Sequence, residues 1–303
     1  MRLNENVPIS LTTPDSCELT RAVRDLADWQ REGGPVQLHP GDVGWFWRYG
    51  AAATAAAVRT WRRDGHVLAI GLLDGPVLRM GIAPEADDDE ELARAMLADA
   101  STPERGVLAH DGTIESRAGA LFRRLLSEEG WRDDEPWTSL HRDLGGPVDD
   151  GGLRVEVVGP ARAAERAAVQ RAAFESSTFF EENWRAMAEG PLYGEARCLV
   201  AYDDEGAAVA AATVWSAGAG RPGLLEPMGV HREHRGRGYG RAICLAAASA
   251  LRDMGASSAT VCTRAANVAA VATYASAGFV ELAPVTDFRR DVGGERLVAS
   301  VPV

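Results

Sequence analysis

The residues best suited to chemistry lie in one short loop that runs from Val230 to Arg241 and reads VHREHRGRGYGR. Glycine lets the backbone turn tightly and come close to a ligand, so several N–H groups can point at one anion. Arginine side chains add fixed positive charge. The residues that matter most lie at its end: Gly236, Gly238, Gly240, Arg235, Arg237 and Arg241. This combination predicts a phosphate-binding loop.

The elements on either side of the loop support the same interpretation. An apolar run from Gly223 to Val230 predicts a strand before it, and the Ala-rich segment from Arg241 to Met254 predicts a helix after it. The start of a helix carries N–H groups without intrahelical partners and the positive end of the helix dipole. The order strand, loop, helix therefore places a favourable anion site at the glycines.

Two common phosphate-binding patterns fit this loop poorly. No Gly-Lys-Ser/Thr follows it, as the Walker pattern requires. The dinucleotide fingerprint needs GxGxxG, whereas the loop has glycine at 236, 238 and 240 and no clear βαβ unit precedes it. The ligand is therefore expected to be another kind of phosphate compound.

The chain repeats itself at an offset of 148 residues. The segment from Gly130 to Leu144 matches the segment from Gly278 to Val292 without gaps, with Gly, Pro, Thr, Arg and Asp in common. The same offset places Gly75 on Gly223 and Met80-Gly-Ile on Met228-Gly-Val. Repetition at a constant offset predicts two similar α/β domains.

The two copies differ at the loop. In the first copy its place is taken by Asp87 to Leu92, which carries carboxylates instead of glycines and arginines. Such a segment would repel a pyrophosphate, and it also suits the solvated start of a helix, where the dipole favours acidic residues. On either interpretation this segment binds no phosphate, so we expect one site per chain, in the second half.

A segment rich in Gly, Pro and Asp, from Gly145 to Gly152, is typical of a linker. We therefore predict an N-terminal domain over residues 1–145 and a C-terminal domain over 153–303. Hydrophobic periodicity predicts the elements of the second half. The predicted strands are 153–158, 197–202, 207–215, 223–230, 258–263, 279–282 and 287–292, and the predicted helices are 161–174, a short one within 176–187, 240–254 and 268–277.

Composition narrows the class of protein. Of 303 residues, 46% are hydrophobic and 25% charged, as in a globular protein with substantial cores. The net charge of −12 argues against a general nucleic-acid binder. Because no signal peptide or membrane-spanning run is evident, we expect a cytoplasmic protein without nucleic-acid or membrane partners. The cysteines are far apart without a CxxC pair, which indicates free thiols: Cys17, Cys198, Cys244 and Cys262.

The loop resembles the acetyl-CoA loop of the GNAT superfamily of N-acetyltransferases, Q/R-x-x-G-x-G/A, which Arg235 to Gly240 fits throughout. The predicted strand order is also that of the family. Asn267 lies where the family often has an asparagine, and Tyr274 followed by Gly278-Phe279 is similar to the family's Tyr-x-x-x-Gly-Phe ending. The resemblance covers about residues 153–295. A degenerate first domain before an active second one is similar in layout to mycothiol synthase, and this likeness assigns no substrate.

The resemblance implies two tandem GNAT-like domains, each a mixed, mostly antiparallel central sheet flanked by helices, with acetyl-CoA as co-substrate and no metal. It implies that the backbone of three strand residues holds the pantetheine arm and polarises the thioester carbonyl: Met228, Gly229 and Val230. It implies that the loop N–H groups bind the pyrophosphate: Arg235, Gly236, Arg237, Gly238, Tyr239, Gly240 and Arg241. Asn267 would contact the cofactor or anchor the loop.

Tyr274 is the candidate acid. The resemblance places it near the thioester sulfur, where a hydroxyl can protonate the departing thiolate. The alternative is a core tyrosine with a satisfied hydroxyl. Its counterpart in the first copy is Leu126, so packing alone does not require a hydroxyl at this position.

Glu226 is the candidate base. A carboxylate within an apolar strand is costly unless it is paired or functional. By period two it should share a face with Met228 and Val230, and its counterpart in the first copy is Leu78. It could act directly, through water, or by binding a cationic substrate. The alternative is a rim carboxylate or a salt bridge to Arg221.

The segment from Ser176 to Met187 is expected to shape the acceptor pocket, as the resemblance implies. Its aromatic and acidic residues would suit an amine on an apolar or sugar-like body: Phe180, Glu181 and Trp184. The aromatics also fall at helical spacing with Met187, which favours plain core packing. Trp45 and its neighbours are expected to pack at a domain interface. His231 and His234 with Glu233 make a weak metal motif, and solvated loop residues are favoured there.

We therefore expect an N-acetyltransferase that moves an acetyl group from acetyl-CoA to a primary amine of a small molecule by direct attack. One alternative is a non-catalytic acyl-CoA-binding or regulatory module, which would need neither Glu226 nor Tyr274. A second alternative is an enzyme that uses another acyl-CoA donor. The contrast with Leu78 and Leu126 in the first copy favours the enzyme.

Overall fold

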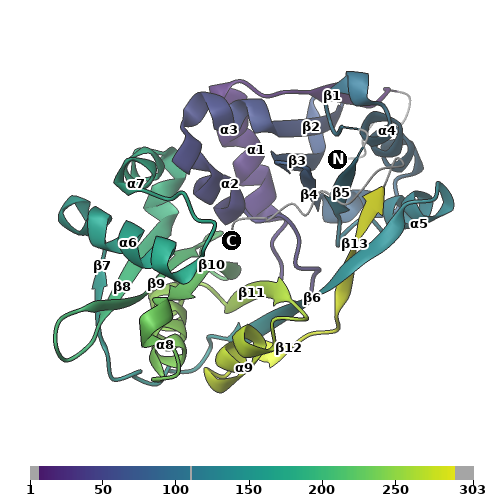
Figure 1. The fold of residues 1–303 in the computed structure, drawn as a ribbon. Helices are drawn as coiled ribbons and strands as arrows, with labels where there is room; N and C mark the ends of the chain where they lie inside the picture. Colours follow the sequence, from purple (N-terminus) through teal and green to yellow (C-terminus); the bar gives the residue numbers. More distant parts are fainter. Residues whose placement is uncertain (1–6, 110, 291–303) are drawn as a thin grey trace. The chain divides into compact units, whose positions relative to one another are not determined.

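The structure, a computed structural model, describes residues 7–109 and 111–290. By their contacts these residues form two compact units (Figure 1), and each is described by itself. Among the described residues, unit 1 contains 7–39, 51–137 without residue 110, and 285–290, and unit 2 contains 40–50 and 138–284. Within these ranges, no helix is long and apolar enough to cross a membrane.

Unit 1 is built on one mixed sheet in the order β1-β2-β3-β4-β5-β13-β6. All neighbouring strands are antiparallel except β4 and β5, which run parallel. Helix α1 packs on β3 and α3, and α4 packs on α5. The strands are β1 (Ser10–Thr12), β2 (Val58–Arg63), β3 (His66–Asp74), β4 (Val77–Ile82), β5 (Gly112–Glu115), β13 (Val285–Arg290) and the first half of β6 (Arg132–Asp143), and the helices are α1 (Ser16–Asp28), α3 (Ala51–Ala57), α4 (Glu90–Ser101) and α5 (Ala120–Glu128).

Unit 2 repeats this design in the order β6-β11-β10-β9-β8-β7, with β12 also paired to β6. Strands β10 and β11 run parallel, whereas β7 to β10 form an antiparallel series. The strands are the second half of β6, β7 (Arg154–Val157), β8 (Ala196–Tyr202), β9 (Ala208–Trp215), β10 (Pro222–Val230), β11 (Ser258–Arg264) and β12 (Val280–Glu281), and the helices are α2 (Pro40–Phe46), α6 (Ala163–Ala173), α7 (Glu181–Ala188), α8 (Tyr239–Asp253) and α9 (Val268–Ser276).

Two apolar clusters cover the two faces of the unit 2 sheet. Helix α8 contributes Ile243 and Leu251 to one cluster, in which Leu225 of β10 is also buried. Helices α6 and α7 form the other cluster with Trp215 and Leu224. Strand β9 is rich in alanine, and these small side chains let α6 and α8 contact it closely from opposite faces. The predicted fold class, a mixed sheet flanked by helices in two tandem copies, is confirmed.

The repeat offset of 148 residues holds in the observed elements. Helix α5 (Ala120–Glu128) maps onto α9 (Val268–Ser276) without a change in length. The short 3-10 helix Pro84–Ala86 likewise maps onto Arg232–His234. Because turns and helix ends coincide as well as strands, the two copies share their architecture down to their connections.

One predicted strand belongs to unit 1 and not, as expected, to the second half. The segments 279–282 and 287–292 were both expected to close the second-half sheet, and the first does so as β12. The second forms β13, which pairs with β5 and with the first half of β6 in unit 1. There Phe288 opposes Ile114 and is buried, which ties the strand to that sheet. Asp291 and Val292 lie outside the described residues.

The Gly-rich segment 145–152 is attached to unit 2. Leu144 N–H donates to the Ser257 carbonyl at 3.0 Å, and Val148 and Leu153 pack against the α8 cluster. A boundary in this segment separates the two copies of the sequence repeat. The contacts divide the chain differently, because 40–50 and 138–145 belong to unit 2 and 285–290 to unit 1.

Candidate functional site

The glycine loop connects β10 to α8 and presents open backbone. Gly236 and Gly238 have φ angles of 77° and 85°, in the left-handed region that favours glycine. A Cβ placed on either residue would meet no atom within 4 Å, so a ligand can approach the backbone there. No side chain caps the start of α8, and its first N–H groups have no intrahelical acceptors. The loop therefore offers an anion site at the N-terminus of a 15-residue helix.

Gly240 has a different role from the other two loop glycines. A Cβ at this position would lie 2.8 Å from Thr273 Cγ2 and 3.5 Å from Val230 Cγ2. Glycine here lets the first turn of α8 approach α9 closely. The sequence pattern grouped three glycines together, but only the first two leave open space.

The loop arginines brace neighbouring helices as well as adding charge. Arg235 Nη2 donates to the Ala173 carbonyl at 2.7 Å, at the C-terminal end of α6. Arg232 binds the two preceding α6 carbonyls at 2.8 and 3.0 Å, and Arg241 Nε donates to the Ser276 carbonyl of α9 at 3.0 Å. These bonds satisfy carbonyls that a helix end leaves without partners. Arg237 is exposed, and among the described residues it makes no such hydrogen bond to a helix carbonyl.

Strands β10 and β11 separate next to the loop. Their parallel pairing joins Pro222–Leu224 to Ser258–Thr260 and goes no further. The remainder of β10, including Met228 to Val230, stays paired with β9 on its other side. An irregularity between Leu225 and Met228 accompanies this separation. Backbone groups on the β11 side of β10 can therefore pair with an extended ligand chain.

The same irregularity corrects one expectation about Glu226. An extra residue in β10 breaks the alternation of side chains between Leu225 and Met228. Leu225, Met228 and Val230 consequently pack against the α8 cluster together. Because the bulge lies between Glu226 and Met228, alternation along the strand no longer determines whether Glu226 shares a face with Met228 and Val230, and the period-two prediction loses its basis. Glu226 is half-buried, and its carbonyl accepts a hydrogen bond from Trp215 Nε1 at 2.9 Å.

Tyr274 is buried on α9, where it is 6% exposed and lies edge-on to Phe279 at 5.9 Å. Burial raises the pKa of its phenol well above 10.0, and the nearby Cys244, Glu226 and Cys262 raise it further. The hydroxyl therefore stays protonated through neutral pH and beyond. These three groups, on α8, β10 and β11, therefore lie within electrostatic reach of the Tyr274 hydroxyl on α9. The two cysteines were not predicted as site residues, since apolar sequence context indicated only burial.

Asn267 caps α9. Its Oδ1 accepts the Ala270 N–H at 3.2 Å, and its carbonyl accepts the same N–H and that of Val271 at 3.0 and 3.1 Å. The residue therefore fixes the start of the helix that carries Tyr274. This is a capping role; contact with a cofactor remains a prediction.

The first copy lacks each of these features at the matching positions. Asp89 caps α4 by accepting the Leu92 N–H at 2.9 Å, and it pairs with Arg63. A carboxylate thus occupies the helix start that is open in unit 2. Leu78 and Leu126 stand where Glu226 and Tyr274 stand, and both are buried in unit 1 at 1% and 0% exposure. At these two matching positions, the same fold therefore carries apolar side chains in unit 1 and polar side chains in unit 2.

The segment from Ser176 to Met187 is mostly exposed or half-buried, with three buried side chains. Trp184 and Met187 are buried, as their helical spacing predicts. Phe180 is 50% exposed because it precedes α7 in an extended conformation and so misses the helical face; it lies against Arg171. Glu181 pairs with Arg185 on the surface of α7. Trp45 belongs to unit 2, where it stacks on Phe179 at 5.0 Å.

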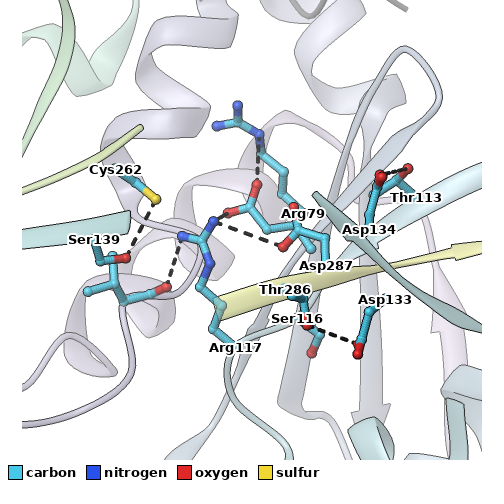
Figure 2. Close-up of polar contacts among 12 residues, drawn as sticks. Arg79, Thr113, Ser116, Arg117, Asp133, Asp134, Ser139, Cys262, Thr286 and Asp287 are labelled. Atoms are coloured by element: carbon cyan, nitrogen blue, oxygen red, sulfur yellow. Dashed lines mark hydrogen bonds and ion pairs between the residues drawn. The ribbon is translucent and has the colours of Figure 1, made fainter. Parts of the chain in front are cut away.

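The loop histidines make local contacts. His231 Nδ1 accepts the Glu233 N–H at 3.3 Å, and the His231 and His234 rings meet edge to face at 5.1 Å. No group of three candidate metal ligands is found in 7–109 and 111–290. All four cysteines are free. Cys262 accepts a hydrogen bond from Ser139 at 3.5 Å within unit 2, as Figure 2 shows.

A separate polar cluster lies inside unit 1, across β4, β5 and β13 (Figure 2). Glu115 contacts Arg79 at 3.6 Å and Arg117 at 3.3 Å, and Arg117 approaches Asp287 at 4.0 Å. Burial disfavours the charge of Glu115, but Arg117 and Arg79 outweigh it and lower the pKa of Glu115. Burial and the Glu115 charge raise the pKa of Asp287 to about 7. The charged side chains of this cluster link β13 to β4 and β5 in unit 1.

Comparison with known proteins adds a family match and a fold match. Residues 164–279 match the model of the acetyltransferase (GNAT) family. This segment contains β10, the glycine loop, α8, β11 and the Tyr274 helix. A search of curated proteins finds no sequence that matches the chain.

Solved structures share the fold over nearly the whole chain. A tandem GNAT protein from the clavulanic acid biosynthesis pathway is 16% identical at a TM-score of 0.60, covering 94% of this chain and 100% of that one. A GNAT-family acetyltransferase from Colwellia psychrerythraea is 15% identical at 0.58, covering 93% and 99%. The N-myristoyltransferase of Saccharomyces cerevisiae, solved with myristoyl-CoA, is 9% identical at 0.58, covering 95% and 79%. At these identities the likeness concerns the fold.

Proposed function

We propose that the chain transfers an acetyl group from acetyl-CoA to a primary amine of a small molecule, as the match of residues 164–279 to the acetyltransferase (GNAT) family model suggests. One observation carries the proposal. The chain holds the same fold twice, but the open glycine loop, the strand carboxylate and the buried tyrosine occur together only in unit 2. Unit 1 has a capped helix and two leucines at those positions.

The residues of unit 2 fit coenzyme A. A pyrophosphate needs N–H donors and open backbone, which Gly236, Gly238 and the uncapped start of α8 supply. A pantetheine chain needs backbone partners along its length, which β10 offers where β11 leaves it. Arg237 adds an exposed positive charge beside the loop.

Bound acetyl-CoA would supply a thioester, from which the amine takes the acyl group with formation of a C–N bond and loss of the C–S bond. Glu226 would accept the proton that the amine gives up, directly or through water. Tyr274 would donate its proton to the departing sulfur, and its raised pKa keeps that proton available. The backbone of Met228 to Val230 would orient the carbonyl for attack. The free thiols and the net charge of −12 support a cytoplasmic protein that acts on small molecules.

The test is thiol release from acetyl-CoA across a panel of primary amines, with acetyl-CoA hydrolysis without amine as the control. Amine-dependent thiol release supports the proposal. Saturable binding of acetyl-CoA without turnover on any amine would overturn it and favour a binding module. Propionyl-CoA and longer acyl-CoA compounds are measured in parallel, and a higher kcat/KM for one of them would overturn the acetyl donor.

A further inference from the structure

A buried arginine with neutral partners lies between α6 and β9 in unit 2. The Arg166 side chain is 0% exposed. Its Nη1 donates to Gln170 Oε1 at 2.9 Å, and its Nη2 donates to Thr213 Oγ1 at 3.4 Å. Phe179 lies over the guanidinium at 5.5 Å. No described residue provides a carboxylate to it.

Burial of such a cation is expensive. Removing a guanidinium from water costs several kcal/mol even after relaxation, and a neutral amide and hydroxyl recover only part of this. An apolar side chain of similar size would pack at this position at lower cost. An aromatic face is also a weaker partner for the charge than an anion. The sequence therefore retains a cation at a position where the residues that the structure describes supply no counter-charge.

Two further buried donors near Arg166 make no hydrogen bond of good geometry among the described residues. They are the indole N–H of Trp184 and the hydroxyl of Tyr193, and Nε of Arg166 is unsatisfied as well. The two rings meet edge to face at 5.9 Å. Burial raises the pKa of Tyr193 and Cys198 adds to this, whereas the nearby indole N–H of Trp184 and the charge of Arg166 lower it, so the three groups lie close together. These atoms belong to N–H and O–H groups, so a ligand that bonds to all of them must provide a hydrogen-bond acceptor.

The cluster lies next to the proposed reaction centre. Trp184 and Phe179 belong to the apolar cluster that contains Trp215 and Leu224. Trp215 donates its indole N–H to the carbonyl of Glu226, and Leu224 lies two residues before Glu226 on β10. A molecule held by these donors would therefore lie on the side of the sheet from which an amine can reach the separated strands.

We propose that Arg166, Trp184 and Tyr193 bind a carboxylate of the acceptor, so that the substrate is an amine that also carries a carboxylate, such as an amino acid. This inference rests on the proposed function and names its substrate class. Phe179, which covers the guanidinium and stacks on Trp45, moves aside when the carboxylate binds. Binding should therefore change the tryptophan fluorescence.

The experiment compares amino acids with the amines that lack only the carboxylate: glycine with methylamine, phenylalanine with phenethylamine, and lysine with cadaverine. Thiol release from acetyl-CoA gives kcat/KM for each member of a pair. A buried charged hydrogen bond corresponds to a preference of roughly 10- to 100-fold for the carboxylate-bearing member. Arg166→Gln should bring that ratio close to one, chiefly by raising KM for the amino acid.

Two variants and one control make the result interpretable. Tyr193→Phe removes one donor and keeps the ring, so the ratio should fall several-fold in a folded protein even if Arg166→Gln does not fold. Arg252→Gln removes a positive charge from the exposed end of α8 and should leave the ratio unchanged. Circular dichroism and Tm establish folding of each variant.

Binding is measured separately from turnover by tryptophan fluorescence and Tm with phenylalanine and phenethylamine, without acetyl-CoA. A response to phenylalanine but not to phenethylamine, weakened in Tyr193→Phe, supports the carboxylate site. If such binding occurs but no amine is acetylated, only the proposed function is overturned. Turnover with equal kcat/KM for both members of each pair would overturn the carboxylate site and leave the proposed function intact.

Discussion

Replacing Tyr274 with phenylalanine tests the proposed acid with little disturbance to the fold. The side chain is 6% exposed and packs edge-on to Phe279, so a phenyl ring of the same shape retains these contacts. No hydrogen bond of the hydroxyl is found among the residues that the structure describes. The change therefore removes one oxygen without leaving a protein group unpaired, and Tm should shift little.

The expected loss of rate follows from the leaving group. A general acid contributes about 10²- to 10⁴-fold, and an ordinary thiol has a pKa of about 8.5, so a thiolate leaves tolerably without help. The loss should lie at the lower end, about 100-fold in kcat, which corresponds to about 2.7 kcal/mol. KM for acetyl-CoA should stay constant, because the loop and β10 hold the cofactor.

The assay is thiol release at saturating acetyl-CoA, measured from pH 6 to pH 10. Burial holds the pKa of Tyr274 above its ordinary value of 10.0, so the acid form persists and the wild-type rate should show no alkaline decline assigned to this residue. Tyr202→Phe removes a hydroxyl from β8, outside the site, and serves as the matched control. Unchanged kcat in Tyr274→Phe, or an alkaline decline below pH 9 that this variant abolishes, would refute the reasoning.

Other predictions test the base, the packing, the number of sites and the buried cluster. Glu226→Gln should lower kcat about 100-fold, and a smaller loss at high pH is expected because the amine then needs no base. Gly240→Ala should lower Tm through its clash with Thr273, and Thr273→Ser, which removes the clashing methyl, should restore part of the loss. Calorimetric titration with acetyl-CoA should give one site per chain; two would contradict the loss of the site in unit 1. The pKa of Asp287 rises from 3.8 to about 7 on folding, so the folded state holds the extra proton and stability falls as pH rises through this window. Urea unfolding should therefore show Asp287→Asn stabilised relative to wild type more at pH 8 than at pH 5, by on the order of 1 kcal/mol.

The sequence predicts those features that follow from local pattern or from repetition. The glycines at 236 and 238 indicate open backbone because few other residues adopt their φ angles. The offset between the copies predicts the bounds of α5 and α9, and it isolates Glu226 and Tyr274 as polar residues at positions that are leucine elsewhere. These inferences need only one chain compared with itself.

Features that depend on which segments meet in space could not be predicted in this way. Strand β13 has the same local pattern in either sheet, and its pairing with β5 is decided by contacts far away in sequence. The bulge before Met228 removes the basis for predicting the face of Glu226, because a single extra residue changes the alternation of side chains. The sequence pattern indicates that Arg235 adds positive charge for a phosphate, whereas in the structure its side chain donates a hydrogen bond to a carbonyl of α6.

The contrast between the copies also explains why the first one retains its fold without the site. Asp89 satisfies the start of α4, which in unit 2 is left open for a ligand. Leu78 and Leu126 replace two polar groups that would be costly to bury if they did no chemistry. We expect each change to stabilise unit 1, whereas the open loop, the carboxylate and the buried hydroxyl should lower the stability of unit 2. This is the distribution expected when only one copy is selected for catalysis.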